Sequence, residues 1–362
     1  MVGAALDDDV DFGADEPDPP HAASTKTDTR TTRRPNTALS LSHRDGSHTT
    51  SALPGRENGR VPIASRIAAM FGCRYPIQQA GMGGIATPEL AVAVARAGGL
   101  GMLSGALSPG QLREQLDAIP DGAAVGVNFL TPFLDRAAVD EAAARTPYVE
   151  FFWATPDAEL VDAVHHAGAR CGWQVGSTDE AKAASDVGCD VIVAQGIEAG
   201  GHVRGRIGLL ALLDEVQGVV EVPVIAAGGI GTGRAMAAAL TAGADAVRIG
   251  TRFIAAVEST AHPVYVDALI DSTADDTELT TAFGEGWPDA PHRVLTSSLE
   301  AGRRLGAAQS WTPDWPQTTY RGAAEARALY AGQSVGAVRS RQSAAEIIDE
   351  LVTEAEQQLS LR

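Results

Sequence analysis

Lysine is almost absent from this chain of 362 residues, in which Lys26 and Lys182 are the only two. A Schiff-base mechanism or a lysine-dependent phosphate site is therefore not expected. Cysteine is also scarce: Cys73, Cys171 and Cys189 are odd in number and lack Cys-x-x-Cys spacing, so they predict neither a disulfide framework nor a zinc site. Free cysteines favour a reducing compartment, and we expect a cytoplasmic protein.

Long apolar runs and an excess of basic charge are missing too. No stretch approaches the roughly 20 apolar residues that cross a membrane, and the formal net charge is -18. Such acidity disfavours nucleic acid and anionic membrane surfaces as partners, and we expect neither. No group of Asp, Glu and His has the spacing of metal ligands, so no metal is expected.

The chain has two parts of different composition. Residues 1–61 hold an acidic patch and then a segment rich in Ser, Thr, Arg and His, with few aliphatic side chains. Such a segment buries too little apolar surface to offset its chain entropy, so we predict a disordered acidic and polar tail. The remainder is long and apolar enough to bury a sizeable core.

Short Val/Ile/Ala/Gly-rich runs alternate with helical patterns from residue 62 to residue 273, which is typical of βα units. Eight such units predict a (β/α)8 TIM barrel. A doubly wound sheet with a second domain is the competitor, and it is disfavoured because no Gly-x-Gly-x-x-Gly follows the first strand. The predicted strands are 76–82, 100–106, 123–129, 148–154, 170–176, 190–196, 223–229 and 246–253.

The regular alternation ends after the eighth predicted strand. Residues 274–340 carry several prolines together with three of the chain's five Trp and two of its five Tyr residues, and we interpret them as a small cap or inserted subdomain over the barrel mouth. Residues 341–362 include an amphipathic pattern from Ser343 to Leu359. This pattern predicts a C-terminal helix that returns to the barrel. The Trp and Tyr residues of the cap are Trp287, Trp311, Trp315, Tyr320 and Tyr330.

Candidate functional residues collect at the predicted carboxyl ends of the strands, where barrel enzymes have their active sites. The sixth strand leads through Gly200-Gly201 to His202, which such a turn would place for proton chemistry on a small molecule. Taken alone, the same sequence is also compatible with a tight turn whose histidine faces solvent.

Two further groups of residues predict a ligand. The turns after the seventh and eighth strands offer Gly229, Gly250 and Thr251, whose N–H groups suit a phosphate. Asn128 and Gln195 are amides at the ends of apolar strands, and either is suited to the edge of a planar heterocycle or to a core hydrogen bond. Gly81 and Met82 would let the backbone approach such a ring.

Five motifs together resemble the nitronate monooxygenase family, formerly called 2-nitropropane dioxygenases. The resemblance covers the chain from about residue 63 to residue 271, in order and at family-like spacing. The motifs are Pro76-Ile-Gln-Gln-Ala-Gly-Met82, Val125-Gly-Val-Asn-Phe129, Ala194-Gln-Gly-Ile-Glu-Ala-Gly-Gly-His202, Val224-Ile-Ala-Ala-Gly-Gly-Ile230 and Ile249-Gly-Thr-Arg-Phe253.

The resemblance implies an FMN-dependent oxidoreductase that converts alkyl nitronates or nitroalkanes and O2 into a carbonyl compound and nitrite. His202 falls at the family's catalytic histidine and would act as general base. Two departures are present: Arg248 stands where glutamine is expected, and Arg204 lies one residue later than in the tightest form of the histidine motif. The implied flavin contacts are Gly81, Met82, Asn128, Gln195, Gly200, Gly229, Arg248, Ile249, Gly250 and Thr251.

Three other functions compete with this interpretation. A flavin-type enoyl-acyl carrier protein reductase (enoyl reductase II) shares the barrel, FMN and the Gly-Gly-His motif, but it requires NAD(P)H. A barrel of the IMP dehydrogenase type needs a catalytic cysteine in a mouth loop, and no cysteine here ends a strand. A flavin-binding protein without activity is the third alternative. The physiological substrate is not determined, and a homodimer is left open as the assembly.

Overall fold

The structure is a computed structural model that describes residues 63–306 and 316–361. Every structural statement below concerns these residues. The predicted tail over residues 1–61 lies outside the described residues, as do Trp311 and Trp315 of the predicted cap.

Eight parallel strands form the predicted barrel. Their order in the sheet is β1-β9-β8-β6-β5-β4-β3-β2, and a parallel bridge from Gln78 to Leu100 joins the first and last of them. Each predicted strand is present, although most are shorter than expected at their ends. The strands are β1 (Ile77–Gln79), β2 (Gly101–Ser104), β3 (Val125–Leu130), β4 (Tyr148–Phe152), β5 (Arg170–Val175), β6 (Val191–Gln195), β8 (Val224–Ala227) and β9 (Ala246–Ile249).

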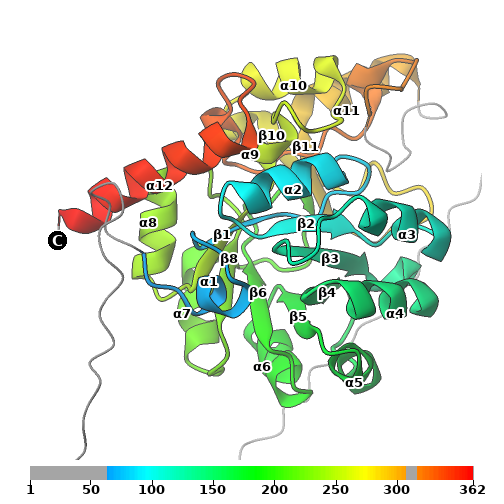
Figure 1. The fold of residues 1–362 in the computed structure, drawn as a ribbon. Helices are drawn as coiled ribbons and strands as arrows, with labels where there is room; N and C mark the ends of the chain where they lie inside the picture. The colour runs from blue at the N-terminus through cyan, green and yellow to red at the C-terminus, as the bar shows by residue number, and fades with distance from the viewer. Residues whose placement is uncertain (1–62, 307–315, 362) are drawn as a thin grey trace, which may run out of the picture. The chain divides into compact units, whose positions relative to one another are not determined.

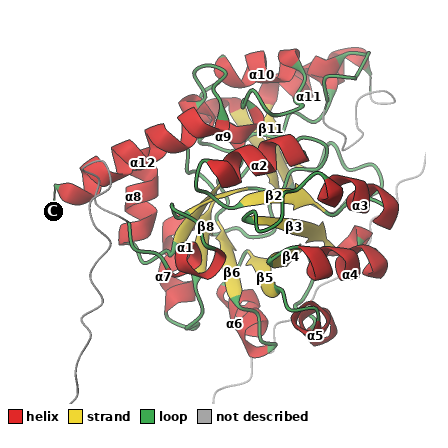
Figure 2. Cartoon of the chain, viewed as in Figure 1, coloured by secondary structure: helices red, strands yellow, loops and turns green. Residues whose placement is uncertain are grey.

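Helices surround these strands, as Figures 1 and 2 show. Several begin at the side-chain caps that their sequences favour: Ser108 and Gln111 form a capping box, and Ser177 caps Glu180. Thr87 occupies the cap position before Pro88, but its hydroxyl makes no capping hydrogen bond. The helices after the strands are α2 (Pro88–Arg96), α3 (Pro109–Asp117), α4 (Arg136–Arg145), α5 (Ala158–His166), α6 (Thr178–Asp186), α7 (Leu209–Gln217) and α8 (Gly233–Thr241).

The C-terminal helix α12 (Ala344–Ser360) lies against outer helices of the barrel. Ser343 caps it in a box with Glu346, and the helix packs against α8 and α2. Its apolar face is buried, with Ile347 and Leu351 almost inaccessible. Near the amino ends of the strands, α1 (Arg66–Phe71) contributes Ile67 and Phe71 to a separate apolar cluster.

A second, three-stranded antiparallel sheet lies over the mouth and has the order β10-β11-β7. It joins β10 (Thr277–Thr280) and β11 (His292–Leu295) to β7 (Gly201–His202), with His292 opposite His202. We call it the cap sheet. The sequence is compatible with a turn at Gly201 and His202, whereas the structure has a short strand there. Its partner β11 lies about 90 residues further along the chain, so no local pattern reveals the pairing.

Shorter elements complete the cap side of the barrel. They are α9 (Thr251–Ile254), α10 (Pro263–Ile270), α11 (Thr296–Leu305) and the 3-10 helices η1 (Thr131–Phe133), η2 (Ala274–Asp276), η4 (Ala324–Ala326) and η5 (Val335–Ala337). Among the described helices, none is both long and apolar enough to cross a membrane. The domain boundaries at residues 61, 273 and 340 stay predictions.

The packing of α12 predicts a measurable loss of stability. Leu351→Ala removes a fully buried side chain, and we expect the free energy of unfolding to fall by about 2–5 kcal/mol. Urea unfolding followed by circular dichroism measures it. Gln357→Ala, on the exposed face of the same helix, is the control and should change stability by less than about 0.5 kcal/mol. Equal effects of both substitutions would contradict the docking of α12.

Candidate active site

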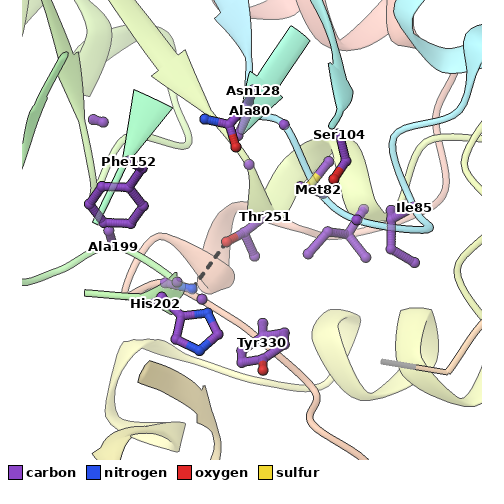
Figure 3. Close-up of a pocket in the computed structure, with 18 of the residues that line it drawn as sticks. Ala80, Met82, Ile85, Ser104, Asn128, Phe152, Ala199, His202, Thr251 and Tyr330 are labelled. Atoms are coloured by element: carbon purple, nitrogen blue, oxygen red, sulfur yellow. Dashed lines mark hydrogen bonds between the residues drawn. The ribbon is translucent and has the colours of Figure 1, made fainter. Parts of the chain in front are cut away.

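A cavity of about 510 Å³ opens at the carboxyl ends of the barrel strands. It lies between barrel residues and cap residues: Figure 3 shows Asn128, Ser104 and Met82 on one side, with His202 and Tyr330 across from them. Ten of the eleven sequence-predicted site residues line this cavity. They are Gly81, Met82, Asn128, Gln195, Gly200, His202, Gly229, Arg248, Gly250 and Thr251.

Ile249 is the predicted site residue that does not line the cavity. Successive side chains of a strand point to opposite faces, so Arg248 faces the barrel interior while Ile249 is buried in the main apolar core. Its carbonyl oxygen accepts a hydrogen bond from the Ala80 N–H at 2.9 Å. Ile249 therefore supports the first strand's end, near Gly81.

Glycine turns from two strands form one wall of the cavity, and we call Gly228, Gly229 and Gly250 the glycine cradle. Gly228 and Gly229 have φ values of 108° and 68°, which favour glycine. A Cβ placed on Gly250 would meet only Ala80 Cβ at 3.5 Å and Met82 Sδ at 4.0 Å, so it would stand in the cavity. The cradle fits a group that needs close contact with backbone N–H groups, such as a phosphate.

A cap segment completes this wall. The Thr251 hydroxyl oxygen accepts a hydrogen bond from the Gly332 N–H at 3.0 Å, which leaves its own hydrogen free to donate. Gly200 packs so closely on the same segment that a Cβ there would lie 2.4 Å from the Gly332 nitrogen. Gly200 is therefore required by the contact between cap and barrel.

A buried ion pair lies at the cavity floor, between Arg248 of β9 and Glu150 of β4. The guanidinium also donates to Gln78 at 2.9 Å and to Gln174 at 2.5 Å. Glu150 is fully buried and accepts from Asn128 Nδ2 at 2.7 Å. Since Nδ2 faces Glu150, the Asn128 carbonyl oxygen is left for the cavity. We did not predict Glu150, although one acid in the apolar run 148–152 was a visible signal.

Gln195 fixes the strand that carries the histidine. Its Nε2 donates to the His202 carbonyl oxygen at 2.9 Å, and its Oε1 accepts from the Arg204 N–H at 3.4 Å. The amide thus bridges β6 and β7 across the turn between them. Of the two roles open to this side chain in the sequence, the structure favours the internal hydrogen bond.

Aromatic rings enclose the His202 imidazole. The Trp287 ring lies over it at 4.3 Å between centroids and 32° between planes, and Tyr330 lies at 5.7 Å. Trp153 contacts it edge-on at 5.7 Å. Burial lowers the pKa of His202 to about 3, with a smaller contribution from neighbouring His292. The imidazole is therefore neutral near pH 7.

His292 is a structural neighbour of His202. Its Nε2 accepts a hydrogen bond from the Phe283 N–H at 3.2 Å, so the proton of the neutral ring sits on Nδ1, which donates to the Ala290 carbonyl at 2.9 Å. Burial lowers the pKa of His292. The ring thus shapes the loop before β11 without charge.

Trp153 is held in an unusual conformation. In the described parts of the chain it is the one residue other than glycine with positive φ, at 89°. Arg204 donates to the Trp153 carbonyl at 2.7 Å and pairs with Glu180. Backbone strain of this kind persists where the surroundings hold it. Arg204 and Glu180 therefore keep the Trp153 ring against His202.

Residues 63–306 and 316–361 contain no group of three or more His, Cys, Asp or Glu that could hold a metal ion. None of the three cysteines lines the cavity. The sequence predicted Trp287 and Tyr330 only as cap residues without a role at the site, and sequence reasoning did not single out Trp153, Gly332 or Glu150. Apart from Glu150, no local pattern marks them, since distant segments bring them to His202.

The closed parallel barrel and its mouth cavity, with a neutral histidine on one wall, define the class: a barrel enzyme for a small organic ligand. The family described as nitronate monooxygenase matches residues 64–124 and 119–354. The chain belongs to the nitronate monooxygenase family and is a flavin-dependent oxidoreductase. This confirms the resemblance seen in the five sequence motifs.

Known proteins agree with this assignment. The chain is 31% identical over 269 residues to a probable nitronate monooxygenase of Staphylococcus aureus (strain JH9), covering 60% of this chain and 76% of the relative. FabK from Thermotoga maritima superposes with a TM-score of 0.75 at 30% identity, over 83% and 98% of the two chains. A nitroalkane oxidase from Streptomyces ansochromogenes gives 0.69 at 28%, over 82% and 99%.

The buried ion pair predicts a loss of stability that a surface pair does not show. Glu150→Gln leaves Arg248 charged and unpaired in the interior, and we expect the free energy of unfolding to fall by about 3–5 kcal/mol. Asp186→Asn breaks the pair with Lys182, in which the two side chains are 61% and 62% exposed, and should cost at most about 1 kcal/mol. Urea unfolding measures both. A Glu150→Gln protein as stable as the parent would contradict the buried ion pair between Glu150 and Arg248.

The enclosure of His202 predicts its titration. In the folded protein the imidazole should stay neutral from pH 8 to pH 5, whereas an unfolded histidine gains a proton near pH 6.5. The unfolded chain then binds more protons than the folded one, so this residue lowers the free energy of unfolding as pH falls from about 6.5 toward 3.

Nuclear magnetic resonance of the imidazole resonances measures this titration. The His202 signal is assigned by its absence in a His202→Asn protein, and the urea-unfolded chain supplies the reference. A His202 signal that titrates near pH 6.5 in the folded protein would contradict the enclosure.

Proposed function

We propose that the protein binds FMN in this cavity and oxidises alkyl nitronates or nitroalkanes with O2 to a carbonyl compound and nitrite, with His202 as general base. The observation that carries the proposal is the placement of a neutral, enclosed histidine and the glycine cradle on the same cavity. Membership of the nitronate monooxygenase family supports the reaction.

The residues present fit a flavin mononucleotide. The glycine cradle and the Thr251 hydroxyl would hold its phosphate, and the Gly81 backbone with the Asn128 carbonyl oxygen would face its ring. When bound, FMN supplies the redox chemistry, accepting electrons from the substrate and passing them to O2. Gln78, Gln174 and Glu150 already engage the guanidinium of Arg248. Only its remaining N–H groups, at the cavity floor, would donate hydrogen bonds to the flavin.

The protein's own chemistry is centred on His202. A neutral imidazole can take the proton α to the nitro group of a neutral nitroalkane, which an imidazolium cannot. Trp153 and Trp287 exclude water from the ring, and Gln195 holds the backbone of the residue. A nitronate that arrives as an anion needs no such proton removal, so His202 would then only orient it.

The alternative function is FMN- and NAD(P)H-dependent enoyl-acyl carrier protein reduction. It is favoured by the superposition on FabK from Thermotoga maritima. An enzyme of the IMP dehydrogenase type is disfavoured because no cysteine lines the cavity in the described part of the chain.

One experiment separates these functions. The purified protein is saturated with FMN and supplied in parallel with an alkyl nitronate in air, or with NADH or NADPH and an enoyl thioester. Nitronate oxidation predicts nitrite release coupled to O2 uptake without NAD(P)H. NAD(P)H consumption that depends on the thioester, with no nitrite from any nitronate, would establish the reductase instead.

His202→Asn should retain bound flavin but lose activity on neutral nitroalkanes by about 100- to 10,000-fold in kcat/KM, since the base is missing. Activity on preformed nitronates should fall less. The flavin absorbance and initial rates of nitrite release measure the two effects. His166→Asn, at an exposed histidine of α5, is the control. Unchanged turnover of nitroalkanes by His202→Asn would rule out His202 as the base.

A further inference from the structure

Two aromatic side chains meet across the entrance of the cavity. Trp287 lies in the loop between β10 and β11, where its backbone N–H donates to the Gly284 carbonyl oxygen at 2.9 Å. Phe133 belongs to η1, directly after β3. Their rings pack edge to face at 5.1 Å and 89°, and both residues line the cavity. We call this pair the aromatic collar.

The aromatic collar leaves an apolar side chain exposed to solvent at the cavity entrance. Phe133 is 52% exposed, which makes it one of few large hydrophobic side chains left open to solvent in the described part of the chain. Together with Trp287 it forms an apolar surface on the cavity wall, and ligand cavities are lined mainly by such side chains. Trp287 also covers His202, so a substrate that reaches the histidine passes the collar.

Positive charge is scarce among the described residues that line the cavity. Among the described residues that line the cavity, Arg248 is the one with a permanently charged side chain, and it is paired with Glu150 at the floor. The loop that carries Trp287 also carries Glu285 and Asp289, both exposed. A second anionic group on a substrate would therefore lose water at the collar without gaining a cation, and the loop beside it carries two exposed carboxylates.

We propose that the aromatic collar makes the enzyme selective for nitronates whose remaining substituent is an uncharged hydrocarbon chain, against nitronates that carry a carboxylate. The inference rests on the proposed nitronate oxidation and names its substrate class. Each methylene buried against the collar should raise kcat/KM about three- to fourfold until the collar is covered.

The first test compares initial rates for the nitronates of nitroethane, 1-nitrobutane and 1-nitrohexane with those for propionate 3-nitronate. We expect kcat/KM to rise along the alkyl series. Propionate 3-nitronate should be at least tenfold poorer than the butane nitronate of similar size, and added salt should narrow the gap by screening Glu285 and Asp289. A preference for propionate 3-nitronate would overturn the inference.

Substitutions at the collar test its role directly. Phe133→Arg places a cation at the entrance and should raise the ratio of carboxylate-bearing to alkyl substrate at least tenfold. Phe133→Ala should flatten the dependence on chain length. Leu210→Arg, at a residue of α7 that is 58% exposed and does not line the cavity, is the matched control and should leave both ratios unchanged. If the Phe133→Arg protein has the same ratio of carboxylate-bearing to alkyl substrate as the parent, the collar does not set the selectivity.

A binding measurement separates failure of this inference from failure of the proposed function. Carboxylates resemble nitronates in charge and shape but do not react. Quenching of tryptophan fluorescence reports the binding of pentanoate and of succinate to the FMN-loaded protein. We expect pentanoate to bind at least tenfold more tightly, even if no nitronate releases nitrite. Equal or tighter binding of succinate would overturn the selectivity whatever the reaction proves to be.

Discussion

The pairing of β7 with β11 is the contact on which the site depends. Two residues of the barrel, Gly201 and His202, become a strand of the cap sheet by pairing with Arg293 and His292. Arg293 reinforces the contact by donating to the Ile197 carbonyl at 3.0 Å. The catalytic candidate is therefore held by hydrogen bonds of the cap as well as by Gln195 of the barrel. Cap and barrel cannot move apart without displacing His202.

Exclusion of water has opposite effects on the charges of Arg248 and His202. Arg248 is buried as an ion, and it is tolerated because Glu150 and two glutamines satisfy its guanidinium. His202 is buried without a counter-ion, so it loses its charge instead. An ion pair at the floor and a neutral imidazole at the wall follow from the same exclusion of water.

Two proteins with different names, FabK and a nitroalkane oxidase, superpose on this chain. The fold alone therefore does not determine the substrate. In this chain we assign the choice of substrate to η1 and to the loop between β10 and β11, whose side chains form the aromatic collar. Loops at the mouth of a barrel vary while its strands keep the site's geometry.

The barrel and its eight strands were predictable from the sequence, because strand periodicity and glycine turns are local patterns. Ten of the eleven site residues that the sequence singled out line the cavity. The sequence did not reveal which way side chains face at strand ends, as Ile249 shows. Only the tertiary structure decided that His202 lies in a strand, that Glu150 orients Asn128, and that Trp153 and Trp287 enclose the imidazole. Each of these contacts joins residues far apart in the chain, and the charge state of His202 depends on all the rings around it.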